Sequence, residues 1–289
     1  MNKINNIILF PNRERDTDLS YTKSIVKTAQ EHSVNVFMHE KFKSELSGFC
    51  ITFLPEEKLV AVKADTAIVL GGDGSILDAC ARIAGTGIPI FGINLGNLGF
   101  LTTIEKTELS VLPYVFENGF ETEERMMLNL NIQDGGTERN ISVLNEVALT
   151  SSVCSKITEL ELRCDDSVAL NCHSDGIIIA TPTGSTAYSL SAGGPILDPS
   201  LEAICVTPIC PHSLMTRPLV FGANAKLTAR GKTNHPQNKD ILVTPDGRDG
   251  ILVSPNAMIT VTRSSFKTKF VKINQNRFFD ILSTKMYKK

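Results

Sequence analysis

Residues 67–75 read Ala-Ile-Val-Leu-Gly-Gly-Asp-Gly-Ser, so a short apolar strand runs directly into three glycines that surround one carboxylate. Glycines allow a left-handed backbone and let a ligand come close to the main chain, as phosphate-binding loops require. The loop matches neither the Walker A pattern nor the Rossmann fingerprint. Because Gly-Gly and Asp-Gly are also common turn dipeptides, this stretch alone fits a phosphate site and a tight strand-to-helix turn equally well.

Asp73 is the unusual member of this loop. A carboxylate repels phosphate unless it binds Mg²⁺, accepts a proton from an attacking hydroxyl group or hydrogen-bonds a sugar hydroxyl. Its presence therefore indicates chemistry at the loop.

The first part of the chain predicts an α/β domain with a mostly parallel sheet, because short apolar runs alternate with helical patterns. The apolar runs are 7–10, 34–38, 67–70 and 88–93, and the helical patterns are 19–30 and 76–83. The glycine loop follows a strand and opens a helix. It should therefore lie at the carboxyl edge of the sheet, where open α/β folds bind ligands and helix N-termini favour anions.

After residue 122 the pattern changes to short strands separated by turn signals, which predicts a β-rich domain over 123–273. The expected strands are 128–132, 141–150, 157–164, 168–172, 176–180, 204–208, 226–230, 241–244, 251–253, 258–262 and 269–273. The tail 274–289 has helix-like apolar spacing and cannot bury itself alone. We expect it to return to the first domain, 1–122.

Composition excludes several classes of protein. The 289 residues are 42% hydrophobic and 21% charged with a net charge of −2, so a nucleic-acid partner is not expected. No apolar stretch approaches the roughly 20 residues of a membrane span, and the N-terminal one is too short for a signal peptide. Seven cysteines without CxxC spacing fit reduced thiols, so we expect a cytoplasmic protein.

A second candidate site is the hydroxyl-rich segment 181–191, which follows the apolar strand 176–180. Its hydroxyl groups can bind polar ligand atoms, but such residues also form helix caps and turns, and capping is the favoured role for Ser185. Asn145 and Glu146 interrupt the apolar run 141–149. Two adjacent polar residues at the centre of a strand suggest the wall of a cleft.

Other polar residues give no site. Arg82 is within reach of a phosphate at the loop, but a surface position on the helix is the preferred interpretation. No metal ligands are assigned, because the isolated histidines lack metal-ligand spacing. These histidines are His32, His39, His212 and His235.

Taken together, these motifs resemble those of the NAD kinase family. The resemblance is carried by the loop 71–75, Gly92–Leu101, Leu144–Glu146, Ser174–Gly176, Thr181–Tyr188 and Arg217–Val220. It implies transfer of the γ-phosphoryl group of ATP, with Mg²⁺, to the 2′-hydroxyl of the adenosine ribose of NAD, giving NADP. Asp73 would orient and deprotonate that hydroxyl group while the loop backbone and the metal hold the phosphates.

The resemblance also implies roles for other residues. Asn145 and Glu146 would hold ribose hydroxyls, Asp175 the nicotinamide side or a partner's nucleotide, and Phe100 the adenine ring. The further expected ligand-binding residues are Gly71, Gly72, Gly74, Ser75, Lys156, His173, Thr186, Ala187, Tyr188, Ser189, Leu190, Ser191 and Arg248.

The chain departs from the family pattern at His173, where bacterial relatives often have an arginine, and at the turn 246–248, where they often have a glutamine. We therefore expect nucleotide affinity to weaken as pH rises through the pKa of His173. The family implies a homo-oligomer, either dimer or tetramer, and we expect a homotetramer. Two alternatives stay open: a lipid or sphingoid kinase, which shares the glycine loop, and a dinucleotide-binding sensor without catalysis.

Overall fold

The computed structural model describes residues 3–152, 158–231, 241–273 and 277–287, and it divides the chain into two compact units. Unit 1 comprises Met1–Glu124 and Thr268–Lys289, and unit 2 comprises Arg125–Lys267. Each unit has its own hydrophobic core, so each is described by itself.

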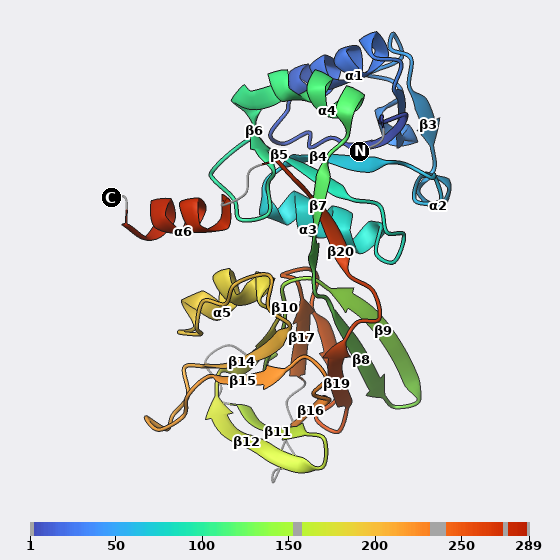
Figure 1. Cartoon of the computed structure of the whole chain (residues 1–289). Helices are drawn as coiled ribbons and strands as arrows, with labels where there is room; N and C mark the ends of the chain where they lie inside the picture. The colour runs from blue at the N-terminus through green and yellow to red at the C-terminus, as the bar shows by residue number, and fades with distance from the viewer. Residues whose placement is uncertain (1–2, 153–157, 232–240, 274–276, 288–289) are drawn as a thin grey trace. The chain divides into compact units, whose positions relative to one another are not determined.

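Unit 1 is built on an eight-stranded sheet with the strand order β3-β2-β1-β4-β5-β20-β7, in which β6 pairs with β5 (Figure 1). The strands are β1 (Asn6–Phe10), β2 (Asn35–His39), β3 (Thr52–Leu54), β4 (Thr66–Gly71), β5 (Ile90–Asn94), β6 (Ile104–Glu105), β7 (Glu121–Arg125) and β20 (Thr268–Lys272). The helices are α1 (Ser20–Glu31), α2 (Glu56–Leu59), α3 (Asp73–Arg82), α4 (Leu112–Asn118) and α6 (Arg277–Tyr287), with 3₁₀ helices η1 (Glu40–Phe42) and η2 (Lys106–Val111). The predicted α/β class with a mostly parallel sheet is confirmed.

The strand order reverses between β1 and β4. From β1 the chain builds outward through β2 and β3, then returns to add β4 on the other side of β1, and β1 pairs in parallel with both neighbours. Ligands of open α/β sheets bind beyond the carboxyl ends of the strands at such a reversal. β4 ends at Gly71 and α3 begins at Asp73, so the glycine loop lies at this point of the sheet.

The C-terminal segment differs from the prediction in one respect. The strand expected at 269–273 was assigned to the β-rich domain, but β20 pairs in parallel with β5 of unit 1 through Phe270 and Ile90. A five-residue strand carries no signal of which sheet it will join, because its partner is remote in sequence. The predicted C-terminal helix is present as α6, in which Ile281 is buried.

Unit 2 consists of two six-stranded sheets whose apolar faces form a shared core. The first sheet has the order β15-β14-β13-β10-β17-β18 and the second β12-β11-β16-β19-β8-β9. The strands are β8 (Leu128–Asp134), β9 (Thr137–Val143), β10 (Glu146–Ser151), β11 (Thr158–Cys164), β12 (Ser167–Ser174), β13 (Gly176–Ala180), β14 (Ala203–Ile209), β15 (Leu219–Gly222), β16 (Leu227–Gly231), β17 (Ile241–Pro245), β18 (Ile251–Val253) and β19 (Met258–Arg263). The pairs are antiparallel, and the predicted β-rich character is confirmed.

The single strand predicted at 141–150 is wrong. The chain breaks at Leu144 and Asn145, so that β9 belongs to one sheet and β10 to the other. Asn145 and Glu146 therefore lie at a corner between two sheets and not at the centre of a strand. Apolar residues on both sides of the corner hid the break, because each strand buries its own apolar face.

Strand alternation in β10 decides which residues face outward. Val147 and Leu149 enter the core between the sheets, while Ala148 lies on the opposite face with Ile178 and Ala180 of β13. Ala192, which follows α5 (Tyr188–Ser191), packs on this second apolar cluster. The hydroxyl-rich segment, with η3 (Thr183–Thr186), thus lies on the outer face of the first sheet.

Candidate active site

The glycine loop of unit 1 is held from the turn that follows β1. Asn12 donates from Nδ2 to Ser75 Oγ over 2.8 Å. Gly71 has φ of 146°, and a Cβ there would lie 2.2 Å from Ser75 Oγ, so only glycine fits. The predicted ligand residue Ser75 therefore has its hydroxyl turned toward Asn12 and Gly71, where it fixes the loop.

The Asp73 carboxylate is oriented by backbone N–H groups. Phe100 N donates to Oδ2 over 2.9 Å, and Leu101 N donates to Oδ1 over 3.0 Å. A Cβ on Gly99 would lie 2.2 Å from Oδ1, so this close approach requires glycine. Asp73 is partly exposed, and its carboxylate has one fixed orientation from which it can meet a hydroxyl group.

Phe100, the residue expected against adenine, packs within unit 1 on helix α6. Its ring centroid lies 5.8 Å from that of Phe278, and Lys285 Nζ lies 4.6 Å from the centre of the Phe100 ring. Phe100 remains partly exposed. Helix α6 thus covers one side of the segment that orients Asp73.

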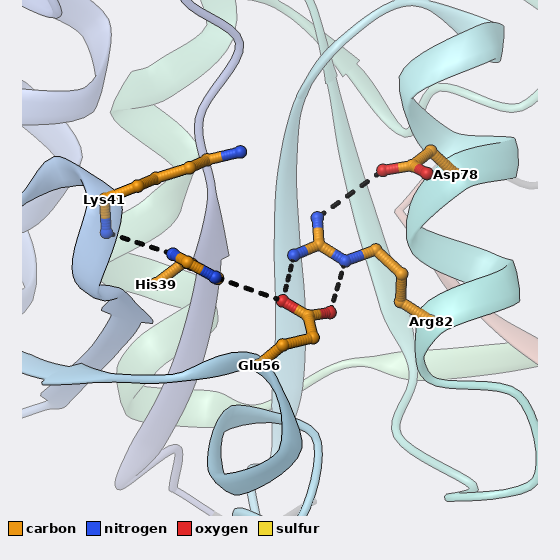
Figure 2. A network of polar contacts seen from close by, with 5 residues as sticks. All are labelled: His39, Lys41, Glu56, Asp78 and Arg82. Carbon is orange, nitrogen blue, oxygen red and sulfur yellow. Dashed lines mark hydrogen bonds and ion pairs between the residues drawn. The ribbon is translucent and has the colours of Figure 1, made fainter.

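Arg82 forms a structural network (Figure 2). Its guanidinium donates to both carboxylate oxygens of Glu56, with Nε 2.5 Å from Oε1, and lies 4.8 Å from the centre of the Phe10 ring. Asp78 accepts a further bond over 3.4 Å, and His39 Nε2 lies 3.8 Å from Glu56. The bonds from Arg82 hold the pKa of Glu56 below its usual value. The network joins β2, α2 and α3, so Arg82 is not a free surface residue.

A cavity of about 460 Å³ opens between the segment after β1 and the start of α3, beside this network. It lies at the strand-order reversal, where such folds bind ligands. Its polar lining includes Asn12, Arg13, Lys41, Ser75, Asp78 and Arg82.

In unit 2 the corner at 144–146 is held by Asp246. The sequence alone indicated only that Asp246 lies in a turn. Its carboxylate accepts from the backbone N–H groups of Leu144 (3.0 Å), Asn145 (2.7 Å) and Glu146 (3.2 Å). Thr181 Oγ1 donates to Leu144 O over 2.6 Å and braces the same corner. The Asp-Gly dipeptide at 246–247, with φ of 49° and 64°, was the signal that a tight turn occurs there.

This corner leaves buried polar atoms without partners. Asn145 Oδ1, Glu146 Oε2 and Arg248 Nε have no hydrogen bond, although Arg248 Nη2 lies 3.0 Å from Asp246 Oδ2. Burial, with the charge of Asp246 as a second cause, raises the pKa of Glu146 to about 8. Burial also raises the pKa of Asp246, against the opposing effect of its backbone hydrogen bonds. Unpaired buried groups are unfavourable in a fold unless a ligand uses them.

A cavity of about 260 Å³ lies next to these atoms within unit 2. Glu146, Ala148 and Thr150 line it from the outer face of β10, and Tyr188 lines it from α5. Tyr188 is exposed, so its ring and phenol are available to a ligand.

The other hydroxyl groups of the segment divide into two kinds. Ser185 Oγ donates to Pro182 O over 2.6 Å and accepts from Leu197 N over 3.0 Å, which agrees with a turn-forming role. Ser189, predicted to bind ligand, is buried with its Oγ 2.8 Å from Thr207 Oγ1. The remaining predicted ligand residues of the segment are partly or fully exposed, namely Thr186, Ala187, Leu190 and Ser191.

Two further predicted residues are on the surface of unit 2. Asp175 is exposed, and the His173 side chain is 64% exposed with Nε2 3.8 Å from Glu159 Oε1. Lys156 lies outside the described residues. In the glycine loop, Gly74 is exposed and Gly72 precedes the first residue of α3.

Comparisons with known proteins agree with this arrangement. Models described as the ATP-NAD kinase N-terminal domain and the ATP-NAD kinase C-terminal domain match residues 7–118 and 144–273. The chain belongs to the ATP-NAD kinase family. A curated relative from Thermoanaerobacter sp. (strain X514), named NAD kinase, is 35% identical over 280 residues, which are 96% of this chain and 97% of that protein. Another, from Geotalea daltonii, is 38% identical over 226 residues, 78% of each chain.

Solved structures of this kinase family have the same fold. An NAD kinase from Archaeoglobus fulgidus in complex with ATP is 26% identical, with a TM-score of 0.77, covering 97% of this chain and 98% of that one. The yeast NADH kinase complexed with NADH has a TM-score of 0.91 at 23% identity, covering 100% of this chain and 90% of that one. The lipid kinase and the binding sensor find no support in these matches. Within the described residues, every helix is too short or too polar to cross a bilayer.

Proposed function

We propose that this member of the ATP-NAD kinase family transfers the γ-phosphoryl group of ATP to the 2′-hydroxyl of the adenosine ribose of NAD, giving NADP and ADP. The observation that carries the proposal is the Asp73 carboxylate, fixed by two backbone N–H groups at the start of α3. The relatives named NAD kinase and the ATP-bound relative supply the substrate classes.

Asp73 is the proposed general base. The 2′-oxygen attacks the γ-phosphorus, its proton passes to Asp73, and the bond from phosphorus to the bridging oxygen breaks with its electron pair leaving on ADP. Phosphoryl transfer depends on the positioning of the reacting groups more than on covalent catalysis, and the hydrogen-bonded carboxylate of Asp73 is positioned in this way. Gly71, Gly72 and Gly74 leave the loop backbone open to phosphate oxygens.

In unit 2, Asn145 and Glu146 are the proposed ribose ligands. Their unpaired oxygens, Asn145 Oδ1 and Glu146 Oε2, can accept from hydroxyl groups that the fold itself does not provide. With a pKa of about 8, Glu146 is mostly protonated at neutral pH and can also donate. We further propose that Tyr188 and the exposed neighbours on α5 contact the base of the nucleotide, and that Asp175, His173 and Arg248 contribute polar contacts.

ATP would act as its Mg²⁺ complex. Among the described residues, no group of three or more His, Cys, Asp or Glu side chains could hold a metal by itself. The triphosphate oxygens and water are therefore the expected main ligands of the ion, as is common for Mg²⁺. Bound in this way, the ion would neutralise charge on the phosphates.

The test is NADP formation from NAD and MgATP by the wild-type chain and by Asp73→Asn. The variant keeps the shape of the side chain and removes the proton acceptor, so turnover should fall by about 10³-fold or more while NAD still binds. Absence of wild-type turnover with intact dinucleotide binding would contradict the kinase assignment. Turnover by the variant at the wild-type rate would contradict the role of Asp73 alone.

We propose in addition that the chain forms a homo-oligomer in the cytoplasm. Leu214 and Met215 of unit 2 are 88% and 83% exposed, which is unusual for large apolar side chains. Sedimentation at working concentration would show a mass above that of one chain, and a monomer would contradict the proposal. Recovery of the activity in the soluble fraction of gently lysed cells, with a secreted marker as control, would test the compartment.

A further inference from the structure

Arg15 lies in a turn that is anchored on both sides within unit 1. Asn12 Oδ1 accepts from the backbone N–H groups of Glu14 (3.0 Å) and Arg15 (3.1 Å), and Asn12 Nδ2 holds Ser75 of the glycine loop. The next residue, Asp16, is buried and accepts from Thr22 N and Thr22 Oγ1 at the start of α1. The backbone of Arg15 is therefore fixed relative to both the glycine loop and helix α1.

The guanidinium of Arg15 lies against two glycines. A Cβ on Gly96 would meet Arg15 Nη1 at 1.8 Å, and one on Gly72 would lie 3.5 Å from the same atom. Gly72 is the residue before α3, whose N-terminus has no side-chain cap. The side chain therefore places its charge beside the uncapped N-terminus of α3.

No described carboxylate forms an ion pair with this guanidinium, and the side chain is exposed. Arg13, two residues earlier, differs in this respect, since it binds Glu45 and the backbone oxygen of Lys41 and stacks on Phe42. An arginine with a fixed backbone and unused side-chain donors at a phosphate loop is suited to an anion, because the guanidinium can bind two phosphate oxygens at once.

One loop accommodates both this cation and the proposed base. Gly96 leaves room for the Arg15 guanidinium, and Gly99, three residues later, leaves room for the Asp73 carboxylate. The two groups do not pair with each other, so each remains available. The base and the arginine thus contact separate residues of the loop 96–99. This arrangement suits a phosphoryl transfer, in which the base meets the acceptor hydroxyl group and the arginine meets the transferring phosphoryl group.

We propose that Arg15 is a catalytic residue that binds the γ-phosphoryl group of the nucleoside triphosphate donor and stabilises its charge during transfer. This inference rests on the proposed function. The guanidinium stays protonated throughout; the 2′-oxygen bonds to the γ-phosphorus, its proton goes to Asp73, and ADP departs with the electrons of the broken bond.

The experiment measures kcat and KM for MgATP and for NAD in Arg15→Gln, with Arg263→Gln of unit 2, an arginine whose Nη1 lies 2.6 Å from Glu202 Oε2, as the control. Arginines that contact a transferring phosphoryl group contribute about 10³-fold or more to turnover, so kcat/KM for MgATP should fall by about that factor. The KM for NAD and the melting temperature should stay within error of wild type. Arg263→Gln should retain wild-type kinetics.

Two further variants separate a chemical role from a structural one. Gly96→Ala keeps the charge but displaces the guanidinium, since the added Cβ meets only the flexible end of Arg15, and it should lose activity toward MgATP in the same way. Arg15→Ala should regain part of its turnover when guanidinium ion is added at millimolar concentration, below the denaturing range.

Wild-type kinetics for MgATP in both Arg15→Gln and Gly96→Ala would overturn the inference. A loss confined to the KM for NAD would also overturn it, because Arg15 would then hold the dinucleotide. If the wild-type chain makes no NADP, the proposed function fails, and that result is distinct from an active wild type with an unaffected Arg15 variant.

Discussion

Two carboxylates of this molecule, Asp73 in unit 1 and Asp246 in unit 2, are held in the same way and have different surroundings. Each accepts hydrogen bonds from consecutive backbone N–H groups, Asp73 from two and Asp246 from three. Asp73 is partly exposed, and no other carboxyl group in the part of the chain that the structure describes is bonded to it. Asp246 is 6% exposed and acts electrostatically on a second buried carboxyl, Glu146.

The difference shows how one device, a carboxylate bound by main-chain N–H groups, can serve two purposes. At Asp73 the N–H groups aim a side chain that water and substrate can reach. At Asp246 the N–H groups hold the corner 144–146 in a buried environment, where a charged group is unfavourable. Burial raises the pKa of Glu146 there, and polar atoms beside it stay without hydrogen bonds. The carboxylate of Asp73 has its hydrogen bonds without a ligand, whereas the corner that Asp246 holds has buried polar atoms without partners.

The largest effect should come from Asp246→Ala. Three buried N–H groups lose their acceptor, and each unsatisfied group costs about 1 kcal/mol or more, so we expect a loss of about 3 kcal/mol in the free energy of unfolding. Removing the charge beside Glu146 offsets part of this. Urea unfolding measures the change.

Asp134→Ala is the control for that variant, because Asp134 accepts from Ser254 N and Ser254 Oγ at a partly exposed site. It should lower stability by about 1 kcal/mol. Equal losses in the two variants would show that the buried corner does not depend on Asp246.

Gly99→Ala should abolish most of the activity with little loss of stability. The added Cβ meets Asp73 Oδ1 at 2.2 Å, so the carboxylate must turn away from Phe100 N and Leu101 N. Misplacement of a catalytic group by about 1 Å commonly costs about 100-fold in rate. Steady-state turnover measures this, with Gly48→Ala as control, since nothing lies within 4 Å of a Cβ there. Full activity of Gly99→Ala would refute the idea that the backbone must aim Asp73.

Glu146→Gln should change how stability depends on pH. The folded-state pKa of about 8 lies above the ordinary glutamate value of 4.5, so the folded chain binds an extra proton between these values, and wild-type stability falls as pH rises through this window. The variant lacks this decline, so its stability relative to wild type should rise between pH 5 and pH 9, by about 1 to 2 kcal/mol after allowance for relaxation around the site. Parallel unfolding curves at pH 5, 7 and 9 would exclude a buried, protonated Glu146.

The smallest effect is expected for Arg82→Gln. The Arg82 and Glu56 side chains are partly exposed, so their ion pair contributes about 1 kcal/mol or less. Thermal unfolding should show this small decrease, and kcat for the proposed reaction should stay within about twofold, because no step of phosphoryl transfer uses Arg82. A fall in kcat/KM for MgATP would instead make Arg82 a phosphate ligand and bring the network of Figure 2 into the site.

The sequence predicted most elements where the pattern was local. The alternation of apolar runs and helical spacing predicted the α/β part, and the strands expected at 157–164 and 168–172 correspond to the antiparallel pair β11 and β12. It failed at 141–150, where an apolar run continues through a sheet corner, and at β20, where the partner strand is about 180 residues away in the chain. Both failures concern which sheet a strand joins, a property set by contacts that are distant in sequence.

The sequence by itself indicates the chemistry of the glycine loop and the candidate base Asp73. The reason is that the backbone flexibility of glycine and the charge of a carboxylate are local properties, which do not depend on distant segments. Tertiary structure alone decided that Phe100 and Leu101 aim Asp73, that Asp246 holds the Asn145 and Glu146 corner, and that Arg15 lies over Gly72 and Gly96. The reason is that hydrogen bonding and burial act through space between segments that can lie about 100 residues or more apart in the chain, and the periodicity of one segment carries no record of its distant partners.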